Sequence, residues 1–158
     1  MKPTDKTNVM RVLESKKIPY ACHTYEADPT LTGAQIAALL GEEPDHVFKT
    51  LVTRGRSNQY YVFVVPVEAE LDLKKAAKAV GEKSVEMIHQ KELLPLTGYV
   101  HGGCSPIGMK KAFPTRIHRS AEGMERICVS AGRVGAQIEL NPEDLRAAAR
   151  CEYADLVP

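Results

Sequence analysis

The sequence lacks a marked excess of either charge and lacks any long apolar run, and each absence excludes a class of protein. The 21 basic and 20 acidic side chains nearly cancel, so no overall positive field exists to hold a polyanion. A nucleic-acid partner would need a local basic patch or a second protein. No segment approaches the roughly 20 apolar residues of a membrane span, and the first twenty residues lack the apolar core of a signal peptide. We therefore expect a cytoplasmic protein with no membrane partner.

The cysteines and histidines lack the spacings typical of metal sites. Cys22, Cys104, Cys128 and Cys151 are far apart and form no CxxC pair, which argues against a disulfide framework, a zinc site and a thiol-redox protein. The five histidines form no HxxxH or HExxH pattern. The sequence predicts free thiols, no bound metal and no cofactor, and it leaves the oligomeric state open.

Length and patterning predict one domain over residues 1–158 with a mixed α/β fold. At 44% apolar composition the chain can bury one sizeable core, and it contains no repeat or linker. Strands interleave with helices, and several strands are joined as hairpins, which favours a mixed, largely antiparallel sheet that curls or closes like a barrel with helices outside. The expected elements are a helix after Thr7, a strand at 20–25, a helix between Thr32 and Gly41, a hairpin of strands 47–53 and 60–66, a helix at 72–80, a short apolar segment at 85–88, a helical turn at 91–96, strands at 116–120, 126–131 and 136–140, and a helix from Asn141.

Lys49 is unusual because it interrupts the apolar strand "VFKTLV". Lysine is depleted in such settings. It can face outward on an amphipathic strand, or it can be a cation held at a cleft, where it binds phosphate or polarises a carbonyl. The spacing alone leaves both interpretations open.

The stretch "VHGGCSPIG" at 100–108 has a similar ambiguity. Gly102 and Gly103 allow a ligand to approach the backbone amides, which could hold a carbonyl oxygen or a developing negative charge. A plain tight turn between strands has the same composition. Cys104 lacks the local signatures of thiol proteases and no GxSxG elbow is present, so a nucleophilic cysteine is the weaker interpretation.

Four motifs in order, "TGAQIAALLG", "VFKTLV", "GGCSPIG" and "VSAGRVG", resemble the YbaK family of aminoacyl-tRNA deacylases over almost the whole chain. That family is similar to the editing domain inserted in bacterial prolyl-tRNA synthetases. The resemblance implies a trans-editing enzyme that removes cysteine from mischarged tRNA(Pro), and it leaves open whether Cys-tRNA(Cys) is also a substrate. Its implied partners are mischarged tRNA(Pro) and prolyl-tRNA synthetase.

The resemblance also implies roles for particular residues. Lys49 matches the functional lysine of the family, and 102–106 match its GxxxP loop. Gln137 stands in a stretch where the family commonly has an aspartate, so amino-acid specificity is less secure than fold. The implied catalytic residues are Lys49, Gly102 and Gly103, and the implied substrate-binding residues are Tyr20, Thr50, Cys104, Ser105, Pro106, Ser130 and Gln137.

The chemistry implied by the resemblance needs no enzyme nucleophile. A cysteinyl thiol has a pKa of about 8.5, so the sulfur of the substrate can attack its own ester carbonyl. The protein then orients the substrate, and the loop acts through its backbone. Two alternatives stay open: a deacylase for another small amino acid, and a non-catalytic module that binds tRNA or the synthetase.

Overall fold

The computed structural model describes residues 5–28 and 30–158, which form eight strands in two sheets with five α-helices. The helices are α1 (Asn8–Ser15), α2 (Gly33–Leu40), α3 (Leu73–Val80), α4 (Gln90–Thr97) and α5 (Pro142–Ala149). The strands are β1 (Ala21–Thr24), β2 (Phe48–Gly55), β3 (Tyr60–Pro66), β4 (Val85–Met87), β5 (Thr115–His118), β6 (Ile127–Ser130), β7 (Ala136–Leu140) and β8 (Cys151–Ala154).

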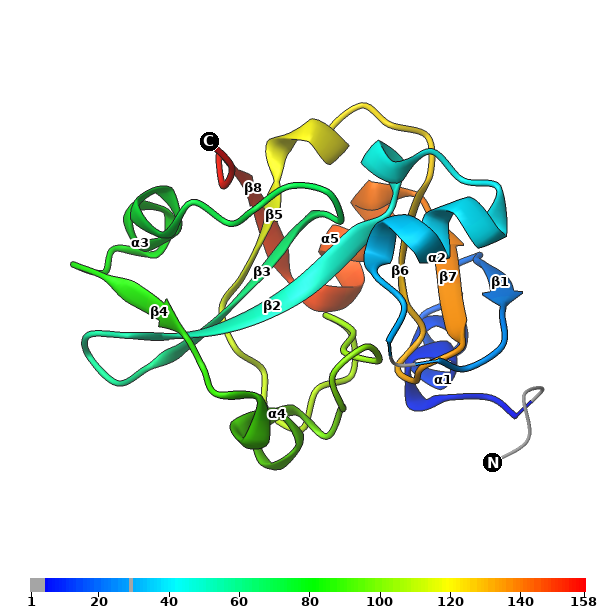
Figure 1. The fold of residues 1–158 in the computed structure, drawn as a ribbon, viewed down its shortest axis with the longest axis horizontal. Coiled ribbons are helices and arrows are strands. Elements are labelled where there is room, and N and C mark those ends of the chain that lie inside the picture. Colours follow the sequence, from blue (N-terminus) through cyan, green and yellow to red (C-terminus); the bar gives the residue numbers. More distant parts are fainter. Residues whose placement is uncertain (1–4, 29) are drawn as a thin grey trace.

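The larger sheet has the order β4-β2-β3-β5-β8. Its centre is the predicted hairpin, in which β2 and β3 pair antiparallel from Phe48 opposite Pro66 to Arg54 opposite Tyr60. The β3–β5 and β5–β8 pairs are parallel, and they bring together segments that are far apart in the chain (Figure 1). The β4 strand pairs with β2 only at residues 53–55, and β6 lies beside the beginning of β2, where the Val47–Cys128 bridge joins the two segments.

The smaller sheet has the order β1-β7-β6, with both pairs antiparallel. One isolated parallel bridge, between Val47 and Cys128, joins it to the region where β2 begins. The largest buried cluster contains apolar side chains of both sheets, such as Phe48 and Val64 from one and Val129 and Ile138 from the other. The two sheets are therefore held together mainly by side-chain packing rather than by main-chain hydrogen bonds.

Sequence signals set the helix ends as expected. Thr32 and Gln35 form a reciprocal capping box at the start of α2, and Gly41 ends the helix in the left-handed conformation with φ of 70°. Asp72 accepts hydrogen bonds from the first amides of α3, and Asn141 does the same for α5. These caps satisfy amides that have no partner inside the helix.

The mixed α/β architecture with helices outside the sheets is confirmed. The strands do not close into a barrel, because those of the described residues divide into two sheets that share one isolated bridge. The strand β8 is absent from the sequence-based expectation. Within residues 5–28 and 30–158, no helix has the length and apolar character needed to cross a bilayer.

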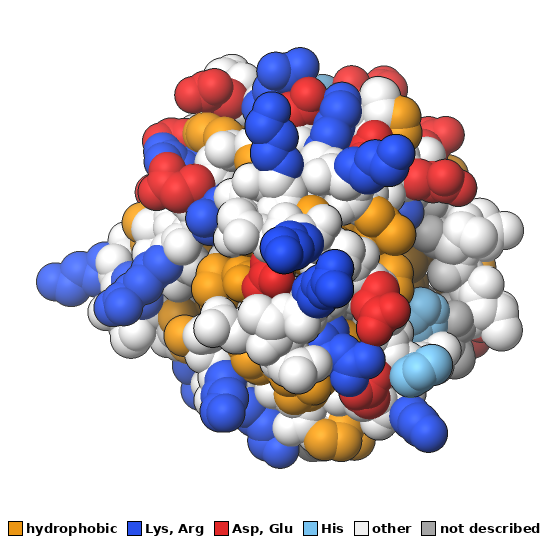
Figure 2. All heavy atoms as spheres, turned by 90° about the vertical axis from the view of Figure 1, so that its left-hand side faces the viewer, with side chains coloured by type: hydrophobic (Ala, Val, Ile, Leu, Met, Phe, Trp, Pro, Cys, Tyr) orange, Lys and Arg blue, Asp and Glu red, His pale blue; other side chains and the backbone are white. Residues whose placement is uncertain are grey.

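The surface reflects the balanced charge of the sequence. Figure 2 shows Lys and Arg side chains dispersed, with Asp and Glu among them, over the face that carries the β2–β3 turn and α3. Some of these charges are paired, as in the ion pair of Arg54 with Glu86 at 3.0 Å. Such exposed pairs contribute little to stability.

Candidate active site

A cavity of about 240 Å³ lies where the two sheets meet, between β2, the start of α2 and the loop that follows α4. Its lining combines residues from both sheets with residues of α2, α4 and several connecting segments. The lining residues are Leu31, Thr32, Gly33, Ile36, Val47, Phe48, Lys49, Thr50, Leu51, Val67, Leu93, His101, Gly102, Cys104, Ser130 and Gln137.

Lys49 lies near the beginning of β2 and lines this cavity, half-buried. No carboxylate of the described residues lies within 4.0 Å of its ammonium group. Burial lowers the pKa of Lys49 from its usual 10.5, and the more distant charge of Glu70 acts in the opposite direction. The ammonium is therefore a partly dehydrated cation without a close counter-charge.

The glycine loop approaches the cavity through its backbone. Gly102 has φ of 86°, a conformation that favours glycine, and it lines the cavity together with Cys104. The Gly103 amide donates to the carbonyl of Val100 at 2.9 Å, whereas the amides of Gly102 and Cys104 donate to no described residue. The amides available to a ligand are thus those of Gly102 and Cys104, and the Gly103 amide closes the turn.

Gly103 also fixes the position of the loop. A β-carbon at this position would lie 2.9 Å from backbone atoms of Arg133 and Val134. The loop at 100–104 is therefore packed directly on the backbone of the segment that joins β6 to β7. This close approach explains why a second glycine is needed here.

The next three loop residues differ in where their side chains lie. Burial raises the pKa of the Cys104 thiol to about 12, so the side chain is a neutral thiol at physiological pH and a poor nucleophile. Ser105 is fully buried, and its hydroxyl accepts a hydrogen bond from the Ile107 amide at 3.4 Å. Pro106 is buried beside a separate hollow of about 350 Å³. Neither Ser105 nor Pro106 is among the cavity-lining residues.

Two buried polar atoms in residues that line the cavity have no hydrogen-bond partner among the described residues: Thr50 Oγ1 and Gln137 Oε1. A buried polar atom without a hydrogen bond lowers stability by about 1–3 kcal/mol, so these atoms favour a ligand that forms hydrogen bonds with them. Ser130 also lines the cavity, but its hydroxyl already accepts a hydrogen bond from the Gly132 amide at 3.1 Å. It shapes the loop beneath the cavity.

Tyr20 is not among the cavity-lining residues. It precedes β1, and its hydroxyl donates to Glu14 at 2.8 Å beside α1. Conversely, three further parts of the lining were not predicted as site residues: His101, Leu93 and the first turn of α2. His101 had one usable signal, because it directly precedes the glycine loop.

The lining is suited to holding and orienting a ligand. It offers one ammonium group, free backbone amides, a hydroxyl and an amide oxygen, while the described lining residues include no carboxylate and a single imidazole, that of His101. The titratable side chains of the described lining are those of Lys49, His101 and Cys104, with no carboxylate that could act as a general base. Electrostatic stabilisation of a carbonyl or phosphate oxygen needs only a cation and hydrogen-bond donors, and the lining provides both.

Comparison with known proteins identifies the family of this chain. The model of the aminoacyl-tRNA editing domain matches residues 27–148. A protein of Enterococcus faecalis, provisionally named Cys-tRNA(Pro)/Cys-tRNA(Cys) deacylase EbsC, is 46% identical over 98% of this chain and 95% of its own length. A proline–tRNA ligase of Pelobacter propionicus is 26% identical over 62% of this chain, which corresponds to 17% of the ligase.

A solved structure gives the same result for the fold. A crystal structure provisionally described as a trans-editing enzyme for prolyl-tRNA synthetase superposes with a TM-score of 0.81 at 25% identity, covering 98% of this chain and 99% of the other. The resemblance to the YbaK family is confirmed by the family model, the relative and the structure together. The chain belongs to the aminoacyl-tRNA editing domain family.

Proposed function

We propose that this protein is a trans-editing hydrolase that removes cysteine from mischarged tRNA(Pro). The observation that carries the proposal is the juxtaposition of Lys49 and the Gly102 loop across one small cavity. The 46% identity to a relative named for hydrolysis of Cys-tRNA(Pro) and Cys-tRNA(Cys) supports the substrate class.

The size of the cavity supports an aminoacyl end as the ligand. At about 240 Å³ it is smaller than the roughly 300–1,000 Å³ of sites that enclose drug-sized molecules. It can enclose a small amino acid and its ester group, while the body of the tRNA stays outside.

The reaction begins with the sulfur of the substrate. The cysteinyl thiolate attacks its own ester carbonyl, a carbon–sulfur bond forms, and the bond from the carbonyl carbon to the ribose oxygen breaks. The ribose hydroxyl of the tRNA takes up the proton that the thiol lost, and a cyclic thioester leaves. Water then opens the thioester to free cysteine. Holding the thiol against the carbonyl recovers several kcal/mol of the barrier.

Three groups of the chain have separate roles in this reaction. The ammonium of Lys49 holds the phosphate or ribose of the acceptor end, because a partly dehydrated cation attracts an anion strongly. The amides of Gly102 and Cys104 support the carbonyl oxygen as it gains negative charge. The free Gln137 Oε1 accepts a hydrogen bond from the amino group of the substrate.

Thiol chemistry explains how such a site can select cysteine. A hydrophobic pocket discriminates between ligands that differ by one methylene by only about 1–3 kcal/mol, so size alone separates small amino acids poorly. A hydroxyl or methyl side chain cannot perform the attack that the thiol performs. Selection therefore rests on reactivity.

Prolyl-tRNA synthetase is the partner that would deliver the substrate. The net charge of +1 gives the chain weak overall attraction for RNA. The similarity to a segment of a proline–tRNA ligase supports a shared system. We propose mischarged tRNA(Pro) as the substrate and the synthetase as the protein that brings it.

The test is deacylation of Cys-tRNA(Pro), Ala-tRNA(Pro), Pro-tRNA(Pro) and Cys-tRNA(Cys), with and without prolyl-tRNA synthetase and with substrate in large excess. The proposal expects many turnovers on Cys-tRNA(Pro) and little on Pro-tRNA(Pro). Preference for Ala-tRNA(Pro) would indicate a deacylase for another small amino acid. Binding without turnover on any substrate would indicate a non-catalytic module.

A further inference from the structure

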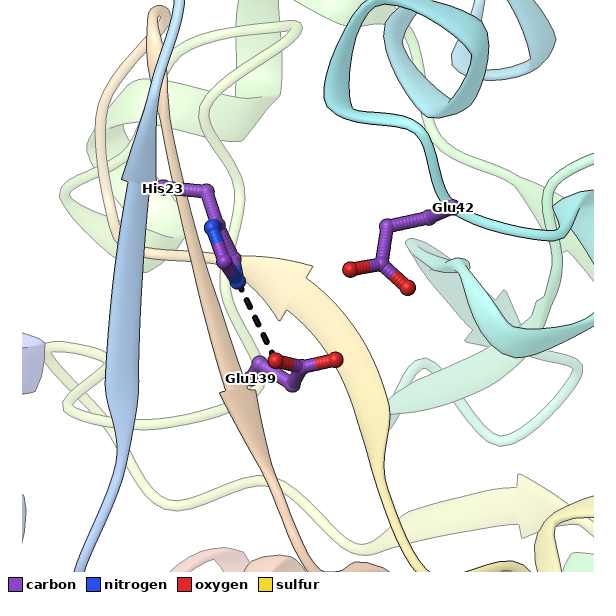
Figure 3. A group of neighbouring side chains, drawn as sticks. All are labelled: His23, Glu42 and Glu139. Carbon is purple, nitrogen blue, oxygen red and sulfur yellow. Dashed lines mark hydrogen bonds and ion pairs between the residues drawn. The ribbon is translucent and has the colours of Figure 1, made fainter.

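Three potential metal ligands from distant parts of the chain converge beside the smaller sheet: His23 on β1, Glu42 just after α2, and Glu139 on β7 (Figure 3). Their ligand atoms all lie within 4.8 Å of one another. His23 Nε2 lies 3.1 Å from Glu139 Oε1, and the carboxylate of Glu42 is turned toward this pair. None of the three lines the cavity that contains Lys49.

The backbone accounts for this convergence. His23 is the direct partner of Gln137 across the β1–β7 pair, so Glu139, two residues further along β7, points to the same face of the sheet as His23. Glu42 follows the left-handed Gly41, and its amide donates to the Ala37 carbonyl at 2.9 Å. This helix-ending turn directs Glu42 toward the sheet.

The charges of the cluster are unbalanced. It holds two carboxylates and one imidazole, and no Lys or Arg of the described residues lies within 4.0 Å of either carboxylate. The side chains of His23 and Glu139 are only 32% and 19% exposed, so water screens them incompletely. Two partly buried carboxylates this close repel each other unless a cation lies between them.

We propose that His23, Glu42 and Glu139 bind a single divalent transition-metal ion, with Zn²⁺ as the reference ion. One imidazole and two carboxylates form a donor set that Zn²⁺ accepts, whereas Ca²⁺ requires six to eight oxygens and Mg²⁺ retains several waters. Neighbouring ligand atoms of a tetrahedral zinc ion are about 3.3 Å apart, close to the separation of His23 Nε2 and Glu139 Oε1. A small rotation of the Glu42 side chain would bring its carboxylate into position as the third ligand.

The ion would add a link between α2 and the smaller sheet, which already pack on each other through the buried side chains of Ala37 and Cys128. Glu42 is at the C-terminal end of α2, while the first turn of α2 lines the cavity. Bound metal therefore fastens α2 to the smaller sheet and steadies one wall of the cavity. Because the ion binds the folded chain, it raises the thermal stability of the protein.

The experiment measures Zn²⁺ binding by calorimetry and the Zn²⁺-induced rise in Tm. The reference chain is the full-length Cys22→Ser variant, since Cys22 is an exposed thiol that could bind zinc by itself. In this background we compare His23→Gln, Glu42→Gln and Glu139→Gln with the matched controls Glu43→Gln and His46→Gln. The controls remove the same functional groups from neighbouring positions outside the cluster.

We expect the reference chain and both controls to bind one equivalent of Zn²⁺, and each ligand variant to lose at least about tenfold in affinity. Co²⁺ in place of Zn²⁺ should give visible d–d absorption without a thiolate charge-transfer band. Failure of the reference chain to bind, equal binding by all three ligand variants, or a thiolate band would each overturn the proposal. Circular dichroism of the metal-free variants checks that they are folded.

Discussion

Lys49 and Gln137 line the same cavity although they belong to different sheets. Lys49 lies near the beginning of β2, and Gln137 is buried on β7, where it pairs with Ser130 on one side and His23 on the other. The cation and the unpaired amide oxygen reach a common ligand only because the two sheets pack on each other. The site is thus a property of the tertiary fold and of neither sheet alone.

Replacing Lys49 should separate activity from stability. Lys49→Met removes the cation and should reduce kcat/KM on Cys-tRNA(Pro) by at least about 100-fold. Burial lowers the pKa of Lys49 in the folded state. At neutral pH the charged lysine therefore lowers the free energy of unfolding, and this destabilisation disappears as the pH rises through and above the folded-state pKa. The variant should therefore unfold at a higher temperature than the parent at pH 7.

The matched control is Glu70→Gln, which removes the carboxylate that acts on Lys49 from a distance. This change should lower the pKa of Lys49 further. Activity should fall at high pH as Lys49 loses its proton, and in the Glu70→Gln variant this fall should occur at lower pH, while kcat at neutral pH is retained. A Lys49→Met variant that deacylates at the parental rate would disprove the role assigned to this cation.

The thiol of Cys104 should be dispensable. Cys104→Ala removes a side chain whose pKa is raised to about 12 and which is therefore not a thiolate at neutral pH. We expect kcat/KM within about threefold of the parent and a stability loss of about 1 kcal/mol from the small void. Single-turnover deacylation and thermal melting measure the two effects. Loss of activity in this variant alone would assign the cysteine a chemical role.

Removing the hydroxyl of Thr50 should raise the stability of the chain and weaken its binding of substrate. Thr50→Val keeps the shape of the side chain and removes Oγ1, which is buried without a partner among the described residues. The free chain should become more stable by about 1 kcal/mol, whereas KM for the substrate should rise about tenfold. Val52→Thr, a change of the same size at a buried position of β2 outside the cavity lining, should lower stability and leave KM unchanged.

The close approach at Gly103 should make alanine harmful there. Gly103→Ala places a β-carbon 2.9 Å from backbone atoms of Arg133 and Val134, so the loop must shift. A displacement of about 1 Å at the carbonyl-binding amides should lower kcat about 100-fold. The control is Gly123→Ala, at φ of 87° in open space, which should destabilise the chain by roughly 1–2 kcal/mol without changing kcat.

Substrate chemistry offers an independent prediction. Ser-tRNA(Pro) has nearly the shape of Cys-tRNA(Pro), but its hydroxyl is a much weaker nucleophile than a thiolate at neutral pH. We expect it to bind in competition with the cysteinyl substrate and to be hydrolysed at least about 100-fold more slowly. Rapid hydrolysis of the seryl ester would point to an attacking water in place of the substrate sulfur.

Local signals predicted much of the fold. The capping box of Thr32 and Gln35, the β-branched and aromatic runs of β2 and β3, and the Asn141 cap are all local signals, and each element formed as expected. The strand β8 was missed because it follows α5 directly and pairs in parallel with β5, a contact that no local pattern specifies.

The candidate site, like the fold, could be predicted from the sequence only where it depends on contiguous motifs. Lys49 and Gly102 could be identified because they belong to contiguous motifs, and the structure brings both to one cavity. The engagement of the Gly103 amide and the distance of Tyr20 from the cavity depend on the path of the chain, which the motifs do not describe. His23 and Glu139 are separated by 116 positions, so a search for ligand spacing finds nothing.

The single bridge between Val47 and Cys128 has an evolutionary consequence. Few main-chain bonds fix the angle between the sheets, so a change in the volume of an interior side chain such as Val129 can tilt one sheet against the other. Such a tilt widens or narrows the cavity while every residue that touches the ligand stays the same. Relatives could thereby acquire new amino-acid preferences through mutations that never meet the substrate.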